Sequence, residues 1–341
     1  MLNQGEVLLL TDRCDRYYFS KKDVAEGYLI IGKEKAYFTD FRYLSDAKRY
    51  FRNTDVNVFL YEGIESIKAY LTERGVNKAY INYGKSTVRE FETFKGIGLI
   101  VLDATEIIDK QREVKSEEEL LLIKKACKIA QRAFYKVIKQ LKVGVTELEI
   151  KEKVERYMVE YGADEPAFET IVAFGKGSAV PHHVTSKKKL TLNQPVLIDM
   201  GARYKGYVSD LTRTVFFGTP TKKFIKAYDL VLRANLLAEE KIKKGYSTDD
   251  CDRLVREYFK GENVEEYFTH SLGHGVGLEV HEFPTLSIKK SSKLKENSTF
   301  TIEPGLYYDG KFGIRIEDTV VMKNGKIERL FTDEKKLLIL K

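Results

Sequence analysis

The stretch PVLIDMGARYKGYVSDLTRTVFFG, residues 195–218, predicts two β-strands joined by a glycine-containing turn. Each strand carries an acid among apolar neighbours, Asp199 in the first and Asp210 in the second. Aspartate is depleted in strands, and a buried carboxylate is costly unless it is paired or bound to a cation. Because the two strands are closely joined, we expect Asp199 and Asp210 to be neighbours in space.

Two glutamates further along the chain have similar surroundings. Glu303 lies in FTIEPG and Glu317 lies in GIRIEDT. Side chains alternate between the two faces of a strand, so each glutamate is expected opposite its isoleucine neighbours, with Arg315 on the same face as Glu317. Any one of the four acids alone would be interpreted as an ordinary strand-end or turn residue. Four together, with a histidine flanked by glycines, favour a functional site.

All five histidines of the chain fall in two short segments that contain glycine or proline. His270, His274 and His281 lie in THSLGHGVGLEVHEFP, residues 269–284, and His182 and His183 are adjacent in AVPHH. Four carboxylates and one imidazole can hold two divalent cations, since the charges balance. This mainly oxygen ligand set suits Mn²⁺, Co²⁺, Fe²⁺ or Zn²⁺. Two such ions can share a hydroxide and polarise a carbonyl, which indicates a hydrolase.

The charged stretch DKQREVKSEEE predicts a boundary between two domains, residues 1–112 and 113–341. The first domain alternates short strands with helices, one of which ends at Gly75, and this indicates a small α/β domain. Its strands are expected at residues 27–32, 35–40, 77–82 and 98–105, the last of the fully buried type. The second domain combines long helices with antiparallel strands, so its class is α+β.

Three helices of the second domain are expected to begin with the same signature, a serine or threonine followed three residues later by an acid. The pairs are Ser116 with Glu119, Thr146 with Glu149, and Ser247 with Asp250. A further long helix is expected over residues 224–245. Strands are expected in 298–308 and 312–331, three in all, with KNGK as a tight hairpin turn.

Composition excludes several classes of protein. There is no apolar run long enough to span a bilayer and no basic start followed by an apolar segment, so we expect a cytoplasmic protein with no membrane partner. Cys14, Cys127 and Cys251 are far apart and are expected to be free thiols. The net charge of +7 is spread along the chain, which is typical of a solvated surface and not of a nucleic-acid site.

The acidic and histidine segments resemble the pita-bread metallopeptidases, the family of methionine aminopeptidase, Xaa-Pro aminopeptidase, prolidase and the metal-free creatinase. The family's order Asp, Asp, His, Glu, Glu is carried here by LIDMGA, SDLTRT, GHGVGLEVHE, TIEPG and GIRIEDT. The resemblance covers the second domain from end to end, and KAYFTDFRYL resembles the family's N-terminal strand-to-helix segment. It implies a C-terminal pita-bread catalytic domain after a smaller, creatinase-like α/β domain.

The resemblance also implies the metal ligands. Asp199 would bind one ion with both oxygens, Asp210 and Glu317 would bridge the two ions, and His274 and Glu303 would complete the other. Manganese is the expected metal, with cobalt, zinc or iron as alternatives.

Further residues are implied to act on the substrate. Glu303 would be the general base on the bridging water, and His281 would steady the substrate carbonyl or the tetrahedral intermediate. His182 and His270 would line the substrate pocket, and His182 is also expected among the catalytic residues.

Three more residues are expected at or near the site. Arg315 would lie beside it, with Tyr307 as a proton-relay or orienting partner, and both are expected among the substrate-binding residues. For His183 the resemblance implies no role, and an adjacent or supporting position is expected.

Within the family, three features resemble the proline-specific branch. These are the N-terminal domain, the glycine after IEP together with Arg315, and His270 four residues before His274. The resemblance then implies cleavage before proline, in which Xaa-Pro aminopeptidase is favoured over Xaa-Pro dipeptidase (prolidase). A non-catalytic binding module is a remote alternative, because such relatives lack ligands that are complete here. A homodimer acting on small peptides with proline in position two is also implied.

Overall fold

The computed structural model describes residues 2–289 and 291–341. The chain divides into two compact units, Met1–Arg112 and Glu113–Lys341. Of the helices in the described residues, none combines the length and the apolar composition needed to cross a bilayer. Among the described residues, Cys14, Cys127 and Cys251 form no disulfide with one another, as expected from their spacing.

The first unit is built on a mixed six-stranded sheet in the order β4-β3-β2-β1-β5-β6. β1 pairs antiparallel with β2 and parallel with β5, so the strand direction changes in the middle of the sheet. The elements are β1 (Glu6–Leu10), α1 (Arg13–Ser20), β2 (Tyr28–Ile31), β3 (Lys35–Thr39), α2 (Phe41–Phe51), β4 (Val56–Leu60), α3 (Ile64–Glu73), β5 (Lys78–Ile81), α4 (Val88–Gly96), β6 (Ile100–Asp103) and α5 (Thr105–Glu113).

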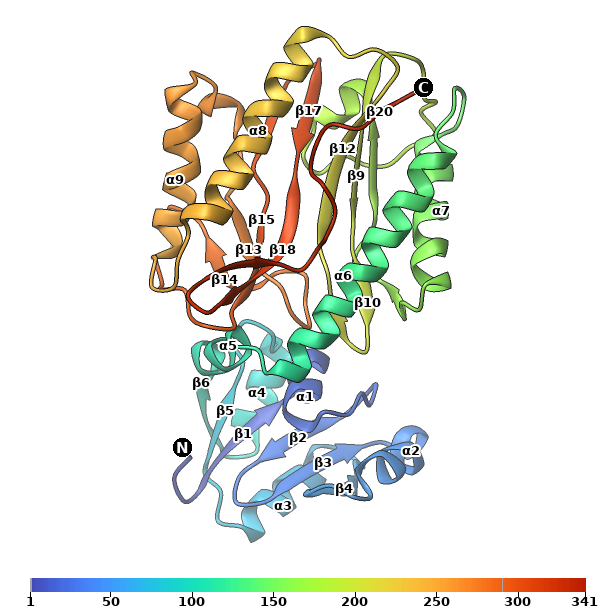
Figure 1. Ribbon diagram of the computed structural model, residues 1–341. Helices are drawn as coiled ribbons and strands as arrows, with labels where there is room; N and C mark the ends of the chain where they lie inside the picture. Colours follow the sequence, from blue (N-terminus) through green and yellow to red (C-terminus); the bar gives the residue numbers. More distant parts are fainter. Residues whose placement is uncertain (1, 290) are drawn as a thin grey trace. The chain divides into compact units, whose positions relative to one another are not determined.

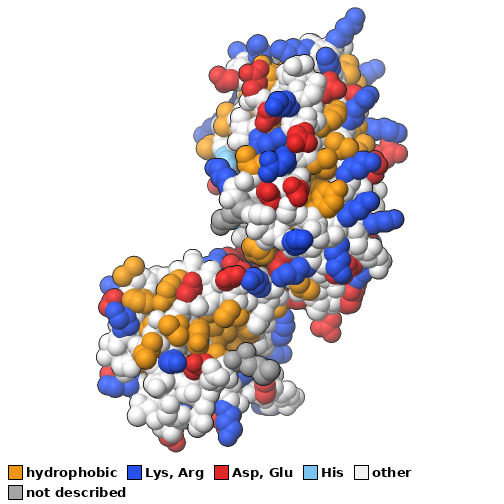
Figure 2. All heavy atoms as spheres, turned by 90° about the vertical axis from the view of Figure 1, so that its left-hand side faces the viewer, with side chains coloured by type: hydrophobic (Ala, Val, Ile, Leu, Met, Phe, Trp, Pro, Cys, Tyr) orange, Lys and Arg blue, Asp and Glu red, His pale blue; other side chains and the backbone are white. Residues whose placement is uncertain are grey.

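One prediction for this unit is wrong. The segment GLIVLDAT was expected to be a fully buried strand, but β6 is the edge strand of its sheet and the side chain of Ile100 is 54% exposed. Figure 2 shows hydrophobic side chains gathered on the face of this unit that lies on the left in Figure 1, the side of β6. An apolar run does not distinguish a central strand from an edge strand, because sheet order is set by distant residues.

The second unit contains a nine-stranded sheet whose main path is β14-β13-β15-β18-β12-β9-β8, with β19 on β18 and β20 on β12. Its strands are β8 (Ile171–Phe174), β9 (Gln194–Met200), β12 (Leu211–Phe217), β13 (Gly273–Gly275), β14 (Glu282–Leu286), β15 (Thr299–Ile302), β18 (Glu317–Lys323), β19 (Lys326–Arg329) and β20 (Ile339–Leu340). Two smaller sheets contain β7 (Glu165–Pro166), β10 (Ala202–Tyr204) and β11 (Tyr207–Val208), and β16 (Gly305–Tyr308) and β17 (Phe312–Arg315). All pairs but β12 with β20 are antiparallel, which confirms the α+β prediction.

The helices of this unit are α6 (Glu117–Val137), α7 (Glu147–Glu160), α8 (Lys222–Lys241) and α9 (Thr248–Gly261), with short 3₁₀ helices at Ile138–Gln140, Gly175–Ala179 and Glu265–Tyr267. In Figure 1, α8 and α6 run across the near side of the sheet. Side chains of α8 and α9 share a core with β15 and β18, in which Phe300 and Val320 are fully buried. Burying such side chains stabilises the unit by about 1.5–3 kcal/mol each.

All three predicted helix starts are confirmed, since Ser116, Thr146 and Ser247 are the N-caps of α6, α7 and α9. Complete capping boxes form at Ser116 with Glu119 and at Thr146 with Glu149. At α9 the Ser247 side chain does not cap the helix, because its hydroxyl donates to the carboxylate of Asp250 instead.

The strands of the site region are more finely divided than expected. Residues 194–217 form a long β9–β12 hairpin, but the tip of this hairpin belongs to a separate small sheet through β10 and β11. Residues 299–329 form five strands where three were expected. The additional breaks fall at Glu303 and Pro304 and at Ile316, which lie between strands.

Candidate metal centre

Five neighbouring strands of the large sheet each bring one acid or histidine to a common cavity. His274 lies in β13, Glu303 directly follows β15, Glu317 begins β18, Asp210 directly precedes β12, and Asp199 lies in β9. All five side chains line a cavity of 680 Å³. These five are the residues that the sequence analysis nominated, and the sheet brings them together from positions more than one hundred residues apart.

Strand register places the acids of β9, β12 and β18 on one face. Thr212 of β12 lies opposite Asp199 on one side and opposite Glu317 on the other. Residues directly opposite one another in antiparallel strands point to the same face. The hydroxyl of Thr212 donates to Oε2 of Glu317 at 2.5 Å and accepts from Nε of Arg315 at 2.9 Å. Thr212 therefore fixes the orientation of Glu317 from within the sheet.

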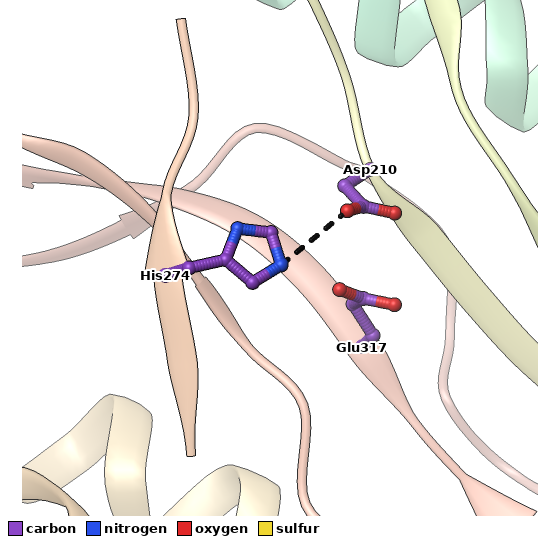
Figure 3. A group of neighbouring side chains, drawn as sticks. All are labelled: Asp210, His274 and Glu317. Atoms are coloured by element: carbon purple, nitrogen blue, oxygen red, sulfur yellow. Dashed lines mark ion pairs between the residues drawn. The ribbon is translucent and has the colours of Figure 1, made fainter. Parts of the chain in front are cut away.

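The tightest group consists of Asp210, His274 and Glu317, whose ligand atoms lie within 4.8 Å of one another. Figure 3 shows the three side chains pointing toward a common centre from separate strands. Nε2 of His274 lies 3.7 Å from Oδ2 of Asp210 and 3.4 Å from Oε1 of Glu303. Such a set of convergent oxygen atoms with one imidazole nitrogen is the donor set of a divalent cation.

The electrostatics of the carboxylates call for a cation. Burial, followed by the charge of Glu317, raises the pKa of both Asp210 and Glu303 well above their ordinary values. Burial, followed by the charge of Asp199, raises the pKa of Glu317 to about 8. Arg315 supplies one positive charge beside these acids, but several buried acids cannot all be ionised at neutral pH beside a single cation.

His274 is neutral, and its ring is held in one orientation. Burial, together with the neighbouring His281, lowers the pKa of His274 to about 3. Its Nδ1 lies 3.1 Å from the carbonyl oxygen of Gly275. A carbonyl oxygen only accepts, so Nδ1 carries the hydrogen and Nε2 presents a lone pair toward the acids. This is the arrangement in which histidine binds a metal ion.

Two buried oxygen atoms provide a direct test of whether a cation fits. Oδ1 of Asp199 and Oδ1 of Asp210 are buried and have no hydrogen-bond partner in the described part of the chain. A buried polar atom that is not hydrogen-bonded costs free energy, and a metal ion at this centre would compensate both atoms. The residues present therefore fit divalent metal ions.

A hydrogen-bonded chain runs along the back of the site from Asp199 to His270. Nη2 of Arg315 donates to Oδ2 of Asp199 at 2.5 Å, and Nη1 donates to the hydroxyl of Tyr307 at 2.9 Å. The same hydroxyl lies 2.9 Å from Nε2 of His270. Asp199 is predicted to bind one metal with both oxygens, and in the structure one of these oxygens, Oδ2, already accepts from Arg315.

The remaining histidines lie along the mouth of the cavity. His182 and His281 line it with exposed side chains, and the ring of His281 packs 4.1 Å from the ring of His274, centroid to centroid. His183 also lines the cavity, but its Nε2 lies 3.0 Å from a carboxylate oxygen of Glu147. Apolar walls are supplied by Phe168, Ile171, Pro181, Val184 and Val280.

Sequence reasoning missed the residues that support the site. Thr212 and Thr301 contact the acids directly, and Thr301 donates to Oε1 of Glu303 at 3.2 Å. Glu147 and Glu282 hold segments that carry histidines. Threonine is common in strands and glutamate is common in the first turn of a helix, so neither residue type by itself indicates a function. The usable signal for Thr212 is the alternation of threonine with other residues in LTRT, residues 211–214.

Comparison with known proteins agrees with a metal centre, since the family model and the relatives are all peptidases. The model of metallopeptidase family M24 matches residues 122–324. The chain is 36% identical over 346 residues to a protein of Pyrococcus horikoshii named Xaa-Pro dipeptidase, with 98% of this chain and 95% of the relative covered. Among solved structures, an Xaa-Pro dipeptidase from Bacillus anthracis superposes with a TM-score of 0.94 at 33% identity, covering 98% of this chain and 95% of the other. An X-Pro aminopeptidase from Thermotoga maritima superposes with a TM-score of 0.91, also at 33% identity, covering 98% and 97%.

Proposed function

The chain belongs to metallopeptidase family M24, and on that basis we propose that it is a dinuclear Xaa-Pro dipeptidase, a prolidase. The observation that carries the proposal is the convergence of Asp210, His274 and Glu317 at a cavity whose mouth carries further histidines. The pita-bread fold of the second unit, the smaller α/β unit before it and the proline-specific branch are confirmed by the relatives. The protein is therefore a metal-dependent hydrolase.

The choice between dipeptidase and aminopeptidase differs from the preference of the sequence analysis. Sequence favoured the aminopeptidase, whereas the two Pyrococcus relatives, from P. horikoshii and P. furiosus, both carry the name Xaa-Pro dipeptidase. The similar structure from Thermotoga maritima keeps Xaa-Pro aminopeptidase as the second candidate. A dipeptidase must hold the free carboxylate of proline. His182 suits this task, because His281 is needed at the oxyanion and the other basic side chains that line the cavity already lie against carboxylates. These are Arg315, His183, His270 and His274.

We propose that Asp199, Asp210, His274, Glu303 and Glu317 hold two divalent cations, with Mn²⁺ the preferred ion for this mainly oxygen donor set. Two cations held there would supply a hydroxide nucleophile and polarise the carbonyl before proline.

The chain's own residues would then handle protons and orientation. Glu303 takes the proton of the attacking water on its carboxylate and passes it to the proline nitrogen, because this carboxylate lines the cavity beside the other acids. His281 donates a hydrogen bond to the developing oxyanion. His270 is held by the hydroxyl of Tyr307, which in turn is held by Arg315. These three residues orient the back of the site and reach the acids through Asp199.

The substrate class follows from the cavity and from the chemistry of proline. The bond before proline is a tertiary amide with no N–H, so an enzyme that binds a peptide through that N–H cannot use it. The apolar side chains of Phe168, Ile171 and Val280 offer the pyrrolidine ring a surface that requires no hydrogen bond. We also propose that the protein acts as a homodimer, which light scattering on the purified protein would test.

One experiment separates the candidates. The protein is stripped with a chelator, reloaded with Mn²⁺, and assayed on an Xaa-Pro dipeptide, an Xaa-Pro-Xaa tripeptide and Met-Ala-Ser. Cleavage of the dipeptide alone supports the prolidase, and cleavage of the tripeptide supports the aminopeptidase. Cleavage of only Met-Ala-Ser would refute both, and inactivity with every divalent metal would favour a binding module.

A further inference from the structure

Glu147, the first residue of α7, has a fully buried carboxylate that accepts four hydrogen bonds. The donors are the backbone N–H of Phe174 at 2.8 Å, the backbone N–H of Ser186 at 3.0 Å, the hydroxyl of Ser186 at 2.7 Å and Nε2 of His183 at 3.0 Å. Hydrogen bonds to an ionised carboxylate are about twice as strong as neutral ones. A single side chain thus ties together residues from both ends of one segment.

That segment, residues 175–185, begins at the end of β8 and carries His182 to the cavity. It is also joined to the hairpin of β16 and β17. The hydroxyl of Ser178 accepts from the backbone N–H of Gly313 at 2.9 Å, and the carbonyl of Pro181 accepts from Nη1 of Arg315 at 3.4 Å. The backbone of the segment is therefore anchored on both sides of His182.

The ring of His183 fills the interior of the segment. A Cβ at Gly177 would lie 2.9 Å from Cε1 of His183, so this position accepts no side chain while the ring is there. His183 is half-buried and faces the carboxylate of Glu147, whereas the adjacent His182 is exposed at the cavity. An exposed side chain is not held by packing, so its position depends on the backbone that carries it.

We propose that Glu147 and His183 are positioning residues that hold His182 at the distance required by the bound peptide. The inference rests on the proposed peptidase function of the site and adds two residues to it. Neither Glu147 nor His183 needs to touch the substrate or the metal ions, because they act through the backbone of residues 175–185. Their loss would let this segment move and would weaken the contact that His182 makes.

The test is a double-mutant cycle on the full-length, metal-loaded protein. His183→Ala and Glu147→Gln are each made alone and together with His182→Ala, and kcat and KM are measured on the peptide that the wild type cleaves. We expect each single variant to lower kcat/KM by about tenfold, in the range of coupled neighbours. In the His182→Ala background the same changes should have less than about a twofold effect. Metal content per chain should stay at the wild-type value throughout.

Two further variants separate positioning from general stability. His183→Gln keeps an N–H that can donate to Glu147, so it should restore most of kcat/KM. Glu149→Gln is the matched control on the same helix, because the hydrogen bonds of the Glu149 side chain in the described part of the chain go to Thr146 at the helix start. It should lower the unfolding temperature without changing kcat/KM.

Three results would overturn the inference. The first is a wild-type kcat/KM in both His183→Ala and Glu147→Gln. The second is a loss of kcat/KM in these variants that adds fully to the loss caused by His182→Ala. The third is that His182→Ala itself leaves kcat/KM unchanged. If Glu147→Gln does not fold, the His183 arm of the cycle decides alone. Failure of the proposed function is a separate result, since the cycle is run on whichever peptide the wild type cleaves.

Discussion

The ammonium of Lys115 lies 2.6 Å from Oε1 of Glu282, and both side chains are almost completely buried. Glu282 directly follows His281, and its carboxylate packs against Gly277, where a Cβ would approach within 2.1 Å. Lys115 also donates to the carbonyl of Glu113, just before α6. The pair thus joins the start of the second unit to the turn that presents His281 to the cavity.

Replacing Lys115 by Met should destabilise the protein by about 3–5 kcal/mol, because a buried carboxylate would lose its ammonium. The double variant with Glu282→Gln should recover part of this loss of stability, since neither side chain of the pair then carries a charge. Urea unfolding at a fixed metal concentration measures both. Lys124→Met is the control: its pair with Glu328 is exposed, so its loss should cost at most about 1 kcal/mol. Equal losses for the buried and the exposed lysine would contradict the prediction.

Asp210→Asn and Glu317→Gln should each lower the number of metal ions retained after dialysis. Activity should fall by more than the roughly 10- to 100-fold that a metal site loses with an outer hydrogen-bond partner. Metal content is measured by elemental analysis and activity at saturating peptide. The exposed Glu328→Gln serves as a control with unchanged metal content. Full metal content in both acid variants would remove these residues from the ligand set.

In the presence of a chelator, the free energy of unfolding should fall as pH rises from about 7 to about 8. Burial, then the charge of Asp199, raises the pKa of Glu317 in the folded state to about 8, above its ordinary value of 4.5. Between these two values the folded state binds more protons than the unfolded state, so raising the pH destabilises it, by up to about 1.4 kcal/mol per pH unit for one group.

His270 and His274, which are partly buried, change the free energy of unfolding in the opposite direction, but at lower pH. Burial is the main cause that lowers the pKa of His274 to about 3 and of His270 to about 4. Their contribution to stability is lost only as pH falls below about 6.5. They therefore do not affect the slope of the free energy of unfolding above pH 7. Glu317→Gln should flatten the alkaline slope, and so should saturating Mn²⁺. A stability that rises over this range without metal would show that the acids are not repelling one another.

Arg213→Met should destabilise the protein by about 3–5 kcal/mol through a buried ion network behind the site. The guanidinium lies 2.6 Å from Asp318 and 2.8 Å from Asp333, and it also donates to the carbonyl of Glu317 at 2.6 Å. Arg213→Lys should recover little, because an ammonium cannot reach all of these acceptors. Urea unfolding measures the change, with the exposed Arg233→Met as the control. A loss of less than about 1 kcal/mol would mean that the network relaxes around the missing group.

Much of the site could be predicted from sequence because its signals are local. Asp199 and Asp210 are conspicuous as acids in apolar strands, and the β9–β12 hairpin needs only a short turn to bring those strands together. The alternation of side chains also placed Arg315 and Glu317 near each other, and Nε of Arg315 lies 3.8 Å from Oε2 of Glu317. The strand is interrupted between these two residues, because Arg315 ends β17 and Glu317 begins β18, and the two strands belong to different sheets.

What could not be predicted depends on contacts between distant residues. The order β13-β15-β18-β12-β9 places the five site residues side by side, yet nothing local shows that β18 lies between β15 and β12. The exposure of Ile100 and the role of Glu147 share this cause, because each depends on a segment elsewhere in the chain. At Ser247 the deviation is local, since its hydroxyl donates to the carboxylate of Asp250 instead of capping the helix.

The assembly of the site from five adjacent strands has a consequence for the lifetime of the protein in the cell. Any opening that separates two of these strands also dismantles the site, so bound metal stabilises the sheet against each such opening by an amount that grows with free metal concentration. Amide hydrogens in β9, β12, β15 and β18 should therefore exchange more slowly as metal is added. Metal starvation would expose the same strands to proteases, and the abundance of the protein would follow the supply of its ions.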